Sequence, residues 1–388
     1  MDSTFARAGR PPILESLAGA AILAVGMGFG RFAFTGMYPL MVKEAVMSVS
    51  TGSLAASANY AGYLVGALAM SGVNERHAAR LSRGALVGTV ASLAVLAIHP
   101  TVTLLIGTRF LAGLVSAVSL VAASVWLLQT MNHQHGAPIL YAGVGVGIAA
   151  SGQLIAIGEA AHVGSPALWL LLAAAAFVLS ALAWPITLHT APLPDEQTQR
   201  TSPSHRSVRP NIGPWTLVVI YGFAGLGYIV TATYLPLLIK TTASHLSAPY
   251  VWACFGLAAV PSCFLWHELH QRCGSRLSLA VNLLVQAIGV VLPVFSHAPS
   301  AFLGSAVLVG GTFVGTVTII MPAAKRVAHV VHFNLMAALT AAYGVGQIVG
   351  PLLSDRLVER THSFDQPLAA AGAALVAAAL VCVVRRSA

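Results

Sequence analysis

The stretch "AVGMGFGRFAFTGMYPLM", from Ala24 to Met41, decides what kind of fold this chain can adopt. It is almost wholly apolar, it contains four glycines, and Arg31 is its one charged residue. A run of about 20 apolar residues is long enough to cross a bilayer as a helix. A guanidinium stays protonated in proteins, and at membrane depth it costs at least about 2.5 to 3.5 kcal/mol unless it faces water or a partner. The stretch therefore predicts a transmembrane helix whose Arg31 faces water or a partner rather than lipid.

The composition extends this interpretation to the whole chain. Of 388 residues, 57% are hydrophobic and 8% are charged, and the mean hydropathy is +0.81. Soluble domains carry roughly 25% charged residues, so a water-soluble core is excluded. Lipid requires each apolar run to satisfy its own backbone groups, so we predict an all-α integral membrane protein with twelve transmembrane helices. The runs lie near residues 13–41, 51–72, 84–98, 101–130, 138–160, 165–188, 213–239, 249–266, 277–296, 299–323, 334–355 and 367–384.

The basic residues between the runs give the expected orientation. With the amino terminus in the cytoplasm, fourteen lysines and arginines fall on the cytoplasmic side, four on the opposite side, and Arg31 and Arg109 inside the membrane. This asymmetry follows the positive-inside rule with both termini cytoplasmic. Basic loops against anionic lipid account for the net charge of +9, so no nucleic-acid partner is needed. The cytoplasmic set is Arg7, Arg10, Arg76, Arg80, Arg83, Arg200, Arg206, Arg209, Arg272, Arg276, Lys325, Arg326, Arg385 and Arg386.

The chain divides at a polar segment, "HTAPLPDEQTQRTSPSHRSVRPNIGP", from His189 to Pro214. Its proline, serine, threonine and arginine content is typical of a solvated linker. A shift of 197 positions places "GFGRFAFTGMYPL" of the first half on "GLGYIVTATYLPL" of the second, with two glycines and the Pro-Leu pair in register. We therefore expect two like-oriented six-helix pseudo-repeats, residues 1–188 and 213–388, joined by a cytoplasmic linker at 189–212. In such proteins the substrate site lies between the halves.

Two segments carry a resemblance to a known superfamily. "RFLAGLVSA", from Arg109 to Ala117, is similar to the fourth-helix motif of the major facilitator superfamily, in which glycine follows an arginine by four residues. "LHQRCGSR", from Leu269 to Arg276, resembles the superfamily's loop signature of aspartate, arginine, glycine and arginine, except that Gln271 occupies the aspartate position. The loop "SGVNERHAARLSR", between the second and third runs, keeps the charge of that signature but not its spacing.

More narrowly, the sequence resembles the bacterial YbfB/YjiJ-type branch of that superfamily. The resemblance covers essentially the whole chain, and it implies the major facilitator fold and a secondary transporter. The resemblance does not identify the substrate. The segments that carry it are "GFGRFAFTGMYPLM", "NYAGYLVGAL" from Asn59, "YGFAGLGYIVTATYLPLL" from Tyr221 and "GGTFVGT" from Gly310.

Arg31 and Arg109 are predicted to lie at one depth. Arg31 precedes the outer end of the first helix, near Pro39, by eight residues, and Arg109 follows the outer start of the fourth, near Thr101, by eight. At about 1.5 Å per residue both lie about 12 Å below the outer surface. No carboxylate shares this level, so the negative charge could arrive with the substrate, as a carboxylate held in an arginine fork. In the alternative, both arginines bind backbone carbonyls near glycines and brace helix contacts.

Other polar residues within the runs could line the same cavity or could join helices to one another. The repeat sets Tyr228 opposite Arg31, which favours Tyr228 as a ligand contact. Proton coupling requires a group that titrates, and Glu159 with nearby His162 is the candidate pair; the alternative is an interfacial pair without a role in coupling. The substrate-binding or coupling candidates are Arg31, Arg109, Asn59, Tyr60, Tyr63, Gln153, Tyr228, Thr231, Tyr343 and Gln347.

Other functional classes find less support in the sequence. The fourteen histidines are scattered, and "HELH" at His267 lacks the interval of the zinc motif HExxH, so we assign no metal and no cofactor. No nucleophile with its base falls at membrane depth, so we expect no enzyme. The sequence predicts a monomeric carrier of the bacterial inner membrane that moves a small organic solute, for which we expect negative charge, by alternating access coupled to protons. The alternative is a non-transporting membrane receptor or scaffold that has kept a carrier fold.

Overall fold

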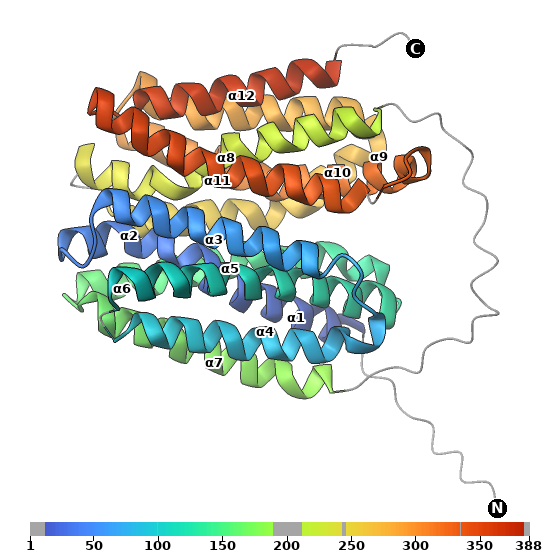
Figure 1. Ribbon diagram of the computed structural model, residues 1–388, viewed down its shortest axis with the longest axis horizontal. Coiled ribbons are helices and arrows are strands. Elements are labelled where there is room, and N and C mark those ends of the chain that lie inside the picture. Colours follow the sequence, from blue (N-terminus) through green and yellow to red (C-terminus); the bar gives the residue numbers. More distant parts are fainter. Residues whose placement is uncertain (1–11, 99, 189–211, 243–245, 334, 384–388) are drawn as a thin grey trace, which may run out of the picture.

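The computed structural model describes residues 12–98, 100–188, 212–242, 246–333 and 335–383. These residues form helices joined by short connections, and most of the helices run side by side along one axis (Figure 1). The linker expected at 189–212 lies outside the described residues except for Ile212, and so do the first eleven residues. The all-α prediction is confirmed for the described part of the chain.

The first predicted run forms one continuous rod. It consists of α1 (Pro12–Leu23), the π-helix η1 (Ala24–Phe32) and α2 (Ala33–Lys43). The remaining elements of this half are α3 (Val49–Ala69), α4 (Glu75–Leu96), α5 (Val102–Val125), η2 (Trp126–Thr130), η3 (Gln134–Gly136), α6 (Ala137–Ala160) and α7 (Ser165–Thr187).

Helix α4 begins nine residues before the apolar run at 84–98. The side chain of Asn74 caps it by accepting a hydrogen bond from the backbone N–H of Arg76, at 2.9 Å. An asparagine at the N-cap stabilises a helix start whatever the hydropathy of the first turns. The charged segment that we expected as a loop is therefore the first part of this helix.

The second half contains α8 (Pro214–Thr242), α9 (Ala248–Phe295), α10 (Pro299–Val327), η5 (Ala328–Val330), α11 (Leu335–Thr361) and α12 (Asp365–Val383). Helix α9 is 48 residues long and covers the two runs that were predicted as separate helices. Gly274 interrupts it with φ 77° and ψ 168°, a conformation that glycine adopts without steric strain. The expected loop is thus a single-residue break. In the described part of the chain, ten helices are long and apolar enough to cross a membrane, and the broken α9 counts as one of them.

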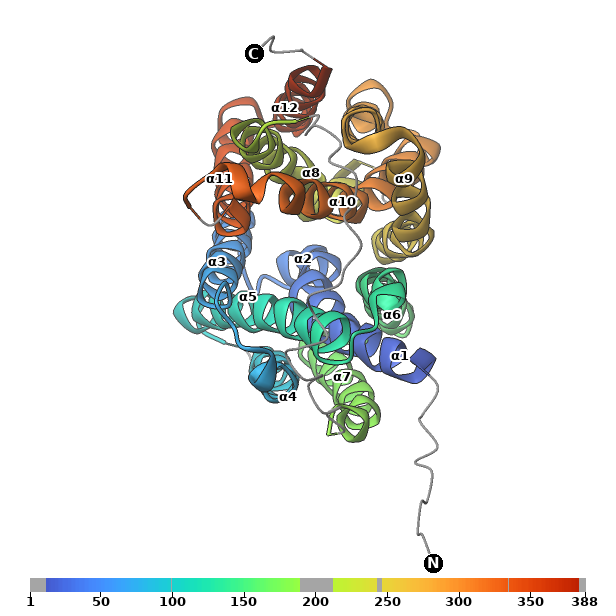
Figure 2. The ribbon, with the colours of Figure 1, turned by 90° about the vertical axis from the view of Figure 1, so that its right-hand side faces the viewer.

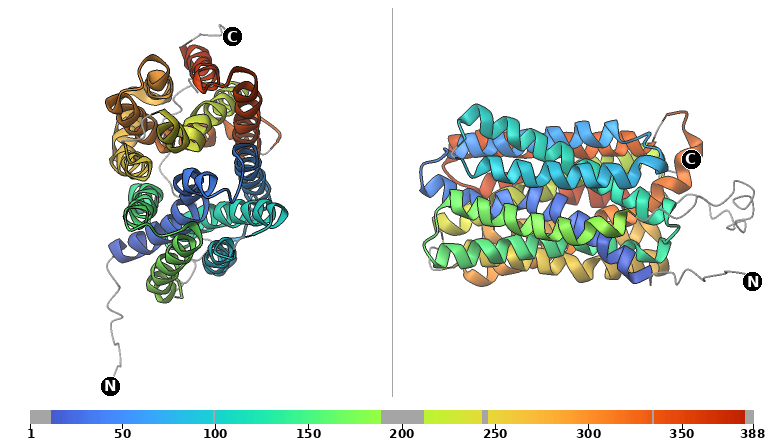
Figure 3. Two further views of the ribbon diagram at one scale, coloured as in Figure 1. Left: turned by 90° about the vertical axis from the view of Figure 1, so that its left-hand side faces the viewer. Right: turned by 90° about the horizontal axis from the view of Figure 1, so that it is seen from below.

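The helices gather in two halves. Viewed along the bundle, α1 to α7 lie in one half and α8 to α12 in the other (Figure 2; Figure 3). The halves meet where α3 packs against α11, α6 against α9, and α2 against α8. The α3–α4 connection, the break in α9 and the α10–α11 connection lie at one end of the bundle, and the α2–α3, α6–α7 and α11–α12 connections lie at the other (Figure 1). We call these the basic end, which carries Arg76, Arg80, Arg272 and Arg326, and the far end.

Hydrogen bonds join the two halves at mid-depth and toward the far end. Tyr60 and Thr233 share a hydrogen bond of 2.9 Å, and Thr35 donates to the backbone oxygen of Ala232 at 2.9 Å. Closer to the far end lies a set of contacts that we call the far-end clamp. It consists of Ser50 and Ser53 donating to Asp355 at 3.0 and 3.3 Å, Tyr234 donating to Ser53 at 2.8 Å, and the Lys240–Glu159 ion pair at 3.2 Å.

Candidate functional site

The glycines of η1 let it pack deep inside the first half. A Cβ atom on Gly28 would lie 2.3 Å from the backbone carbon of Gly147 on α6, and one on Gly30 would lie 2.8 Å from Thr89 on α4. All nine residues of η1 are buried. π-Helical turns are rare and occur often at functional sites. Because side chains larger than hydrogen would not fit there, the sequence "GMGFGR" brings Arg31 into the centre of the protein.

The guanidinium of Arg31 is buried among aromatic rings. The side chain is 3% exposed, and its Cζ lies 4.1 Å from the ring centre of Tyr63, 5.1 Å from Tyr60 and 5.2 Å from Phe32. Its Nε and Nη2 have no hydrogen-bond partner among the described residues. Cation–π contacts offset part of the lost hydration, but buried donors without acceptors remain unfavourable. Nε and Nη2 form one edge of the guanidinium, so this edge, which we call the free edge, makes no hydrogen bond within the described chain.

Arg109 has different surroundings from Arg31. Its Nη1 donates to the backbone oxygen of Gly30 at 3.1 Å, its Nη2 donates to that of Arg31 at 3.0 Å, and its Cζ lies 4.3 Å from the ring centre of Phe34. Asn59 in turn donates to the backbone oxygen of Arg109 at 2.8 Å. The structure thus brings the two arginines together, and the terminal edge of the Arg109 guanidinium holds the backbone that carries Arg31.

An aromatic cluster of the second half closes the opposite side of the centre. The ring of Tyr228 lies 5.6 Å from that of Phe313 and 5.7 Å from that of Tyr343, nearly parallel to both. Phe313 also packs edge-on against Phe32 of the first half, at 5.9 Å, and so links the cluster to the residue that follows Arg31. Gln347 donates a hydrogen bond from Nε2 to the Tyr228 hydroxyl. These rings come from α8, α10 and α11 of one half and η1 of the other.

Among the buried polar atoms of the second half that have no hydrogen-bond partner within the described chain, two belong to candidate residues of the site. They are Oε1 of Gln347 and Oγ1 of Thr231, whose residues are both 0% exposed. A buried oxygen without a donor is unfavourable in a protein interior. Gln347 is bonded to Tyr228 through Nε2, and Thr231 follows Tyr228 by three residues on α8, so both are close in sequence or in contact with the aromatic cluster.

Gln153 and Glu159 do not join this centre. Gln153 lies on an exposed stripe of α6, together with Val146 and Ile157, which are 50% and 54% exposed. Glu159 pairs with Lys240 at the far end, within a cavity of about 310 Å³ that Ser247 and Tyr250 also line.

Sequence reasoning missed several residues at or near the sites, among them Phe32, Phe34 and Phe313 in the central aromatic contacts and Lys240 in the far-end ion pair. Phe313 falls within "GGTFVGT", a segment that we had used only for the resemblance. Lys240 carried the signal of an isolated lysine at the outer end of a run. In the part of the chain that the structure describes, no group of three or more His, Cys, Asp or Glu residues is placed to hold a metal ion.

The sequence matches the family model described as "Uncharacterised MFS-type transporter YbfB" over residues 23–383. No curated protein matches the sequence. One similar solved structure is a crystal structure of a mutant of the nucleoside transporter NupG, with a TM-score of 0.68 and 11% sequence identity, covering 95% of this chain and 99% of that chain. At this identity the likeness concerns the fold alone. Because the family model spans most of the sequence, the chain is a multi-pass membrane protein that belongs to the MFS transporter family represented by YbfB, a family of transporters rather than enzymes.

Proposed function

We propose that the protein is a secondary active transporter of the bacterial inner membrane, which moves a small organic anion by alternating access and couples this movement to protons. The observation that carries the proposal is the buried Arg31, whose Nε and Nη2 lack hydrogen-bond partners in the described chain. Its twelve transmembrane helices form two six-helix bundles, residues 1–188 and 213–388, that rock about a site between them. The basic end faces the cytoplasm, in accordance with the positive-inside rule.

The count of twelve depends on α3 and α9. The break at Gly274 lets the two parts of α9 cross the membrane separately. The 21 residues of α3 span about 31 Å, enough for a hydrocarbon core of about 30 Å. Polar residues lower its hydropathy, but Ser53 and Tyr60 bind the other half instead of facing lipid. Helix α3 is therefore a crossing at the interface between the bundles.

Equivalent glycine contacts support the two repeats. A Cβ atom on Gly113 of α5 would lie 1.9 Å from the backbone oxygen of Asn59 on α3. One on Gly310 of α10 would lie 2.2 Å from the backbone oxygen of Phe255 on the first part of α9. Gly113 and Gly310 are 197 positions apart, the same shift that aligns the first helices of the two halves. The first bundle thus has a close contact between two of its helices through Gly113, and the second bundle has the equivalent contact through Gly310.

Electrostatics favour an anion as the substrate. Neither Arg31 nor Arg109 forms an ion pair with a carboxylate of the described residues; Glu159 pairs with Lys240 and Glu268 with Arg272. The free edge of Arg31 has the geometry that binds a carboxylate through two parallel hydrogen bonds. Aromatic rings flank this edge, and they favour a substrate whose carboxylate is attached to an apolar or aromatic body.

The far-end clamp supports alternating access. Carriers with two repeats expose one site to each side in turn, which requires contacts between the halves that form and break. The hydroxyl, carboxylate and ion-pair contacts of the clamp hold the halves together on one side of Arg31. In our proposal they are the contacts that break when the transporter opens toward the far end.

The Lys240–Glu159 pair is the proposed point of proton coupling. Glu159 belongs to the first half and Lys240 to the second, and the two side chains are 15% and 34% exposed, so both are partly accessible. Protonation of Glu159 would cancel its charge and weaken the attraction that joins the halves. Protons would then shift the balance between the closed and open forms of the far end.

Ligand-dependent thermal stability tests the substrate class. Purified protein in detergent is heated with organic acids, sugars, cationic drugs and nucleosides, the last because the structural neighbour is named as a nucleoside transporter. We expect organic carboxylates to raise the unfolding temperature, Arg31→Gln to abolish the shift, and the exposed Arg356→Gln at the far end to keep it. Stabilisation by neutral or cationic compounds alone would show that the substrate is not an anion.

Uptake into proteoliposomes under an imposed proton gradient tests the transport step. Carboxylate-dependent proton movement, lost in Arg31→Gln and kept in Arg356→Gln, is the expected result. A protein that binds the carboxylate without moving it would instead support the alternative of a receptor or scaffold with a carrier fold.

A further inference from the structure

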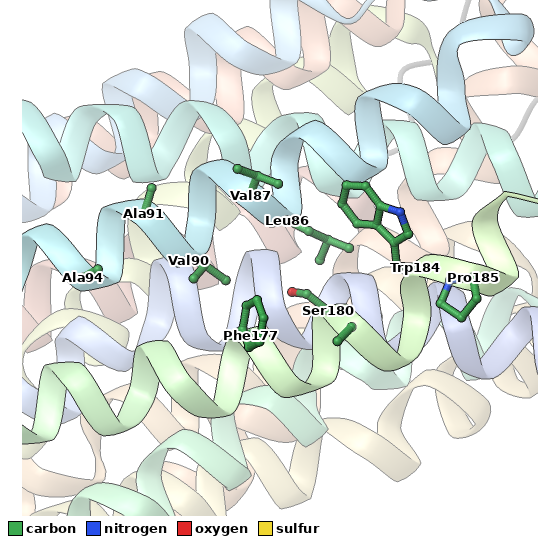
Figure 4. Close-up of a pocket in the computed structure, with 10 residues that line it drawn as sticks. Leu86, Val87, Val90, Ala91, Ala94, Phe177, Ser180, Trp184 and Pro185 are labelled. Atoms are coloured by element: carbon green, nitrogen blue, oxygen red, sulfur yellow. The ribbon is translucent and has the colours of Figure 1, made fainter.

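An apolar groove runs between α4 and α7, away from the central site. Figure 4 shows side chains of the two helices facing each other across it, and Figure 2 places both helices on the side of the first half that is remote from the second half. The groove has a volume of about 580 Å³. It is lined by Leu86, Val87, Val90, Ala91 and Ala94 of α4 and by Phe177, Ser180, Ala181, Trp184 and Pro185 of α7.

Small side chains make this groove. Ala91 and Ala94 on α4 and Ala181 on α7 leave room that longer side chains would fill, while Val87 and Phe177 stand at its rim, 57% and 62% exposed. In a protein that spans a membrane, such exposed apolar side chains face hydrocarbon. The groove is therefore a site for a hydrocarbon chain, and its volume lies within the range of ligand pockets, about 300 to 1,000 Å³.

Arginines stand at the basic end of the groove. Arg83 lies one turn before Leu86 and is half-buried; its Nη1 donates to the backbone oxygen of Thr187 at 3.2 Å, and its Cζ lies 5.7 Å from the ring centre of Trp184. A guanidinium has five N–H donors, so this bond leaves donors for an anion. Tryptophan and arginine side by side at a helix end are typical of the membrane–water interface.

The arginines and the groove share one face of α4. Arg80, Arg83, Val87, Val90 and Ala94 follow one another at intervals of three or four residues, which places them on the same side of a helix. Arg80 is exposed, and Arg83 lies between it and the apolar liners. The surface therefore changes from cationic to apolar along one line, as a phospholipid changes from headgroup to acyl chain.

We propose that this groove binds an anionic phospholipid, with one acyl chain between α4 and α7 and the headgroup phosphate on Arg83 and Arg80. Hydrocarbon tails of any phospholipid fit an apolar groove, so the arginines decide which headgroup is retained. Basic pockets between transmembrane helices bind anionic headgroups in this way. An attraction of this kind gives roughly a fivefold preference for each arginine close to the anionic lipid.

Native mass spectrometry tests the proposal on the full chain. Detergent-purified protein is mixed with phosphatidylglycerol or phosphatidylcholine of identical acyl chains, and the bound lipid is counted. We expect the wild type to retain phosphatidylglycerol in preference, and Arg83→Gln with Arg80→Gln to reduce this preference toward one. Arg83→Lys should keep most of it, and Arg356→Gln at the far end should keep all of it. Filling the groove by Ala91→Trp should reduce the binding of both lipids.

A fluorescence measurement on the wild type supports the test where a variant fails to fold. Phosphatidylglycerol with brominated acyl chains should quench tryptophan fluorescence more than brominated phosphatidylcholine, and Trp184→Phe should remove this difference. Equal retention and equal quenching by the two lipids in the wild type would overturn the proposal. A preference for phosphatidylglycerol that survives the double arginine substitution, or lipid binding that survives Ala91→Trp, would also overturn it.

Discussion

Replacement of Gly113 by alanine should disturb both packing and the candidate site. A Cβ atom at this position would lie 1.9 Å from the backbone oxygen of Asn59 and 2.9 Å from the backbone nitrogen of Tyr63. Both atoms belong to the main chain of α3, so a side-chain rotation cannot relieve the clash. Helix α3 would have to move away from α5 by more than about 1 Å to restore ordinary van der Waals separation. The shift would carry Tyr63 away from the guanidinium of Arg31.

The size of the effect follows from a matched control in the same helix. A Cβ atom on Gly107 of α5 meets nothing within 4 Å, so Gly107→Ala adds no contact. Both substitutions gain a similar helix propensity, up to about 1 kcal/mol. Their difference in free energy of unfolding therefore isolates the clash, for which overpacking of an interior gives about 1 to 3 kcal/mol. Gly113→Ala should be the less stable of the two by that amount.

Thermal unfolding of the two variants in the same detergent measures this difference. We expect Gly113→Ala to unfold at a lower temperature than Gly107→Ala, and to bind the stabilising carboxylate more weakly, because Tyr63 flanks Arg31 at 4.1 Å. Equal unfolding temperatures, or a more stable Gly113→Ala protein, would refute the close approach of α3 to α5 on which the site geometry depends.

Three further substitutions test individual contacts. Tyr228→Phe removes the acceptor of Gln347 and should lower the free energy of unfolding by about 1 to 3 kcal/mol, since a buried amide loses its partner; an unchanged unfolding temperature would contradict this. Arg109→Lys keeps the charge but loses the two-pronged contact with backbone oxygens, so it should also lower the unfolding temperature, and wild-type stability would argue against bracing. Lys240→Gln breaks a partly exposed ion pair with Glu159, so the free energy of unfolding should fall by no more than about 1 kcal/mol. Hydrogen exchange at the far ends of α6 and α8 should nevertheless accelerate, because the pair joins these two helices.

Hydropathy was sufficient to place most of the helices, and it failed where a cap or a backbone conformation sets the boundary of a helix. The described residues confirm a helical rod through the first run and helices in all later ones. Hydropathy misplaced the start of α4, because an asparagine cap extends that helix into the charged segment. It also suggested a loop at Gly274, where a single residue with positive φ breaks one long element. Backbone effects of this kind leave no trace in an apolar pattern.

The depth of the site was easier to predict from the sequence than the residues that belong to it. Counting residues brought Arg31 and Arg109 to one level, and the structure joins them through a backbone oxygen. Gln153 could not be excluded from sequence, because α6 is apolar on nearly all sides and its periodicity identifies no inner face. Its glycines identify that face, since Gly143 and Gly147 approach the backbone of α1 and η1, while Gln153 lies on the exposed stripe. Glycines at close contacts between helices thus identify the inner face of α6 better than the positions of its polar residues do.

The two central arginines differ because of what each finds within reach of its donors. Arg109 meets two backbone oxygens of the π-helix, and these oxygens occupy the terminal edge of its guanidinium. Arg31 comes from the π-helix itself, and its Cζ lies over the rings of Tyr60 and Tyr63. A cation held on aromatic faces keeps its hydrogen-bonding edge unsatisfied. Nε of Arg109 also lacks a partner, but only Arg31 leaves two adjacent nitrogens, Nε and Nη2, without partners in the described chain. Our proposal therefore assigns the support of the backbone to Arg109 and the binding of a substrate carboxylate to Arg31.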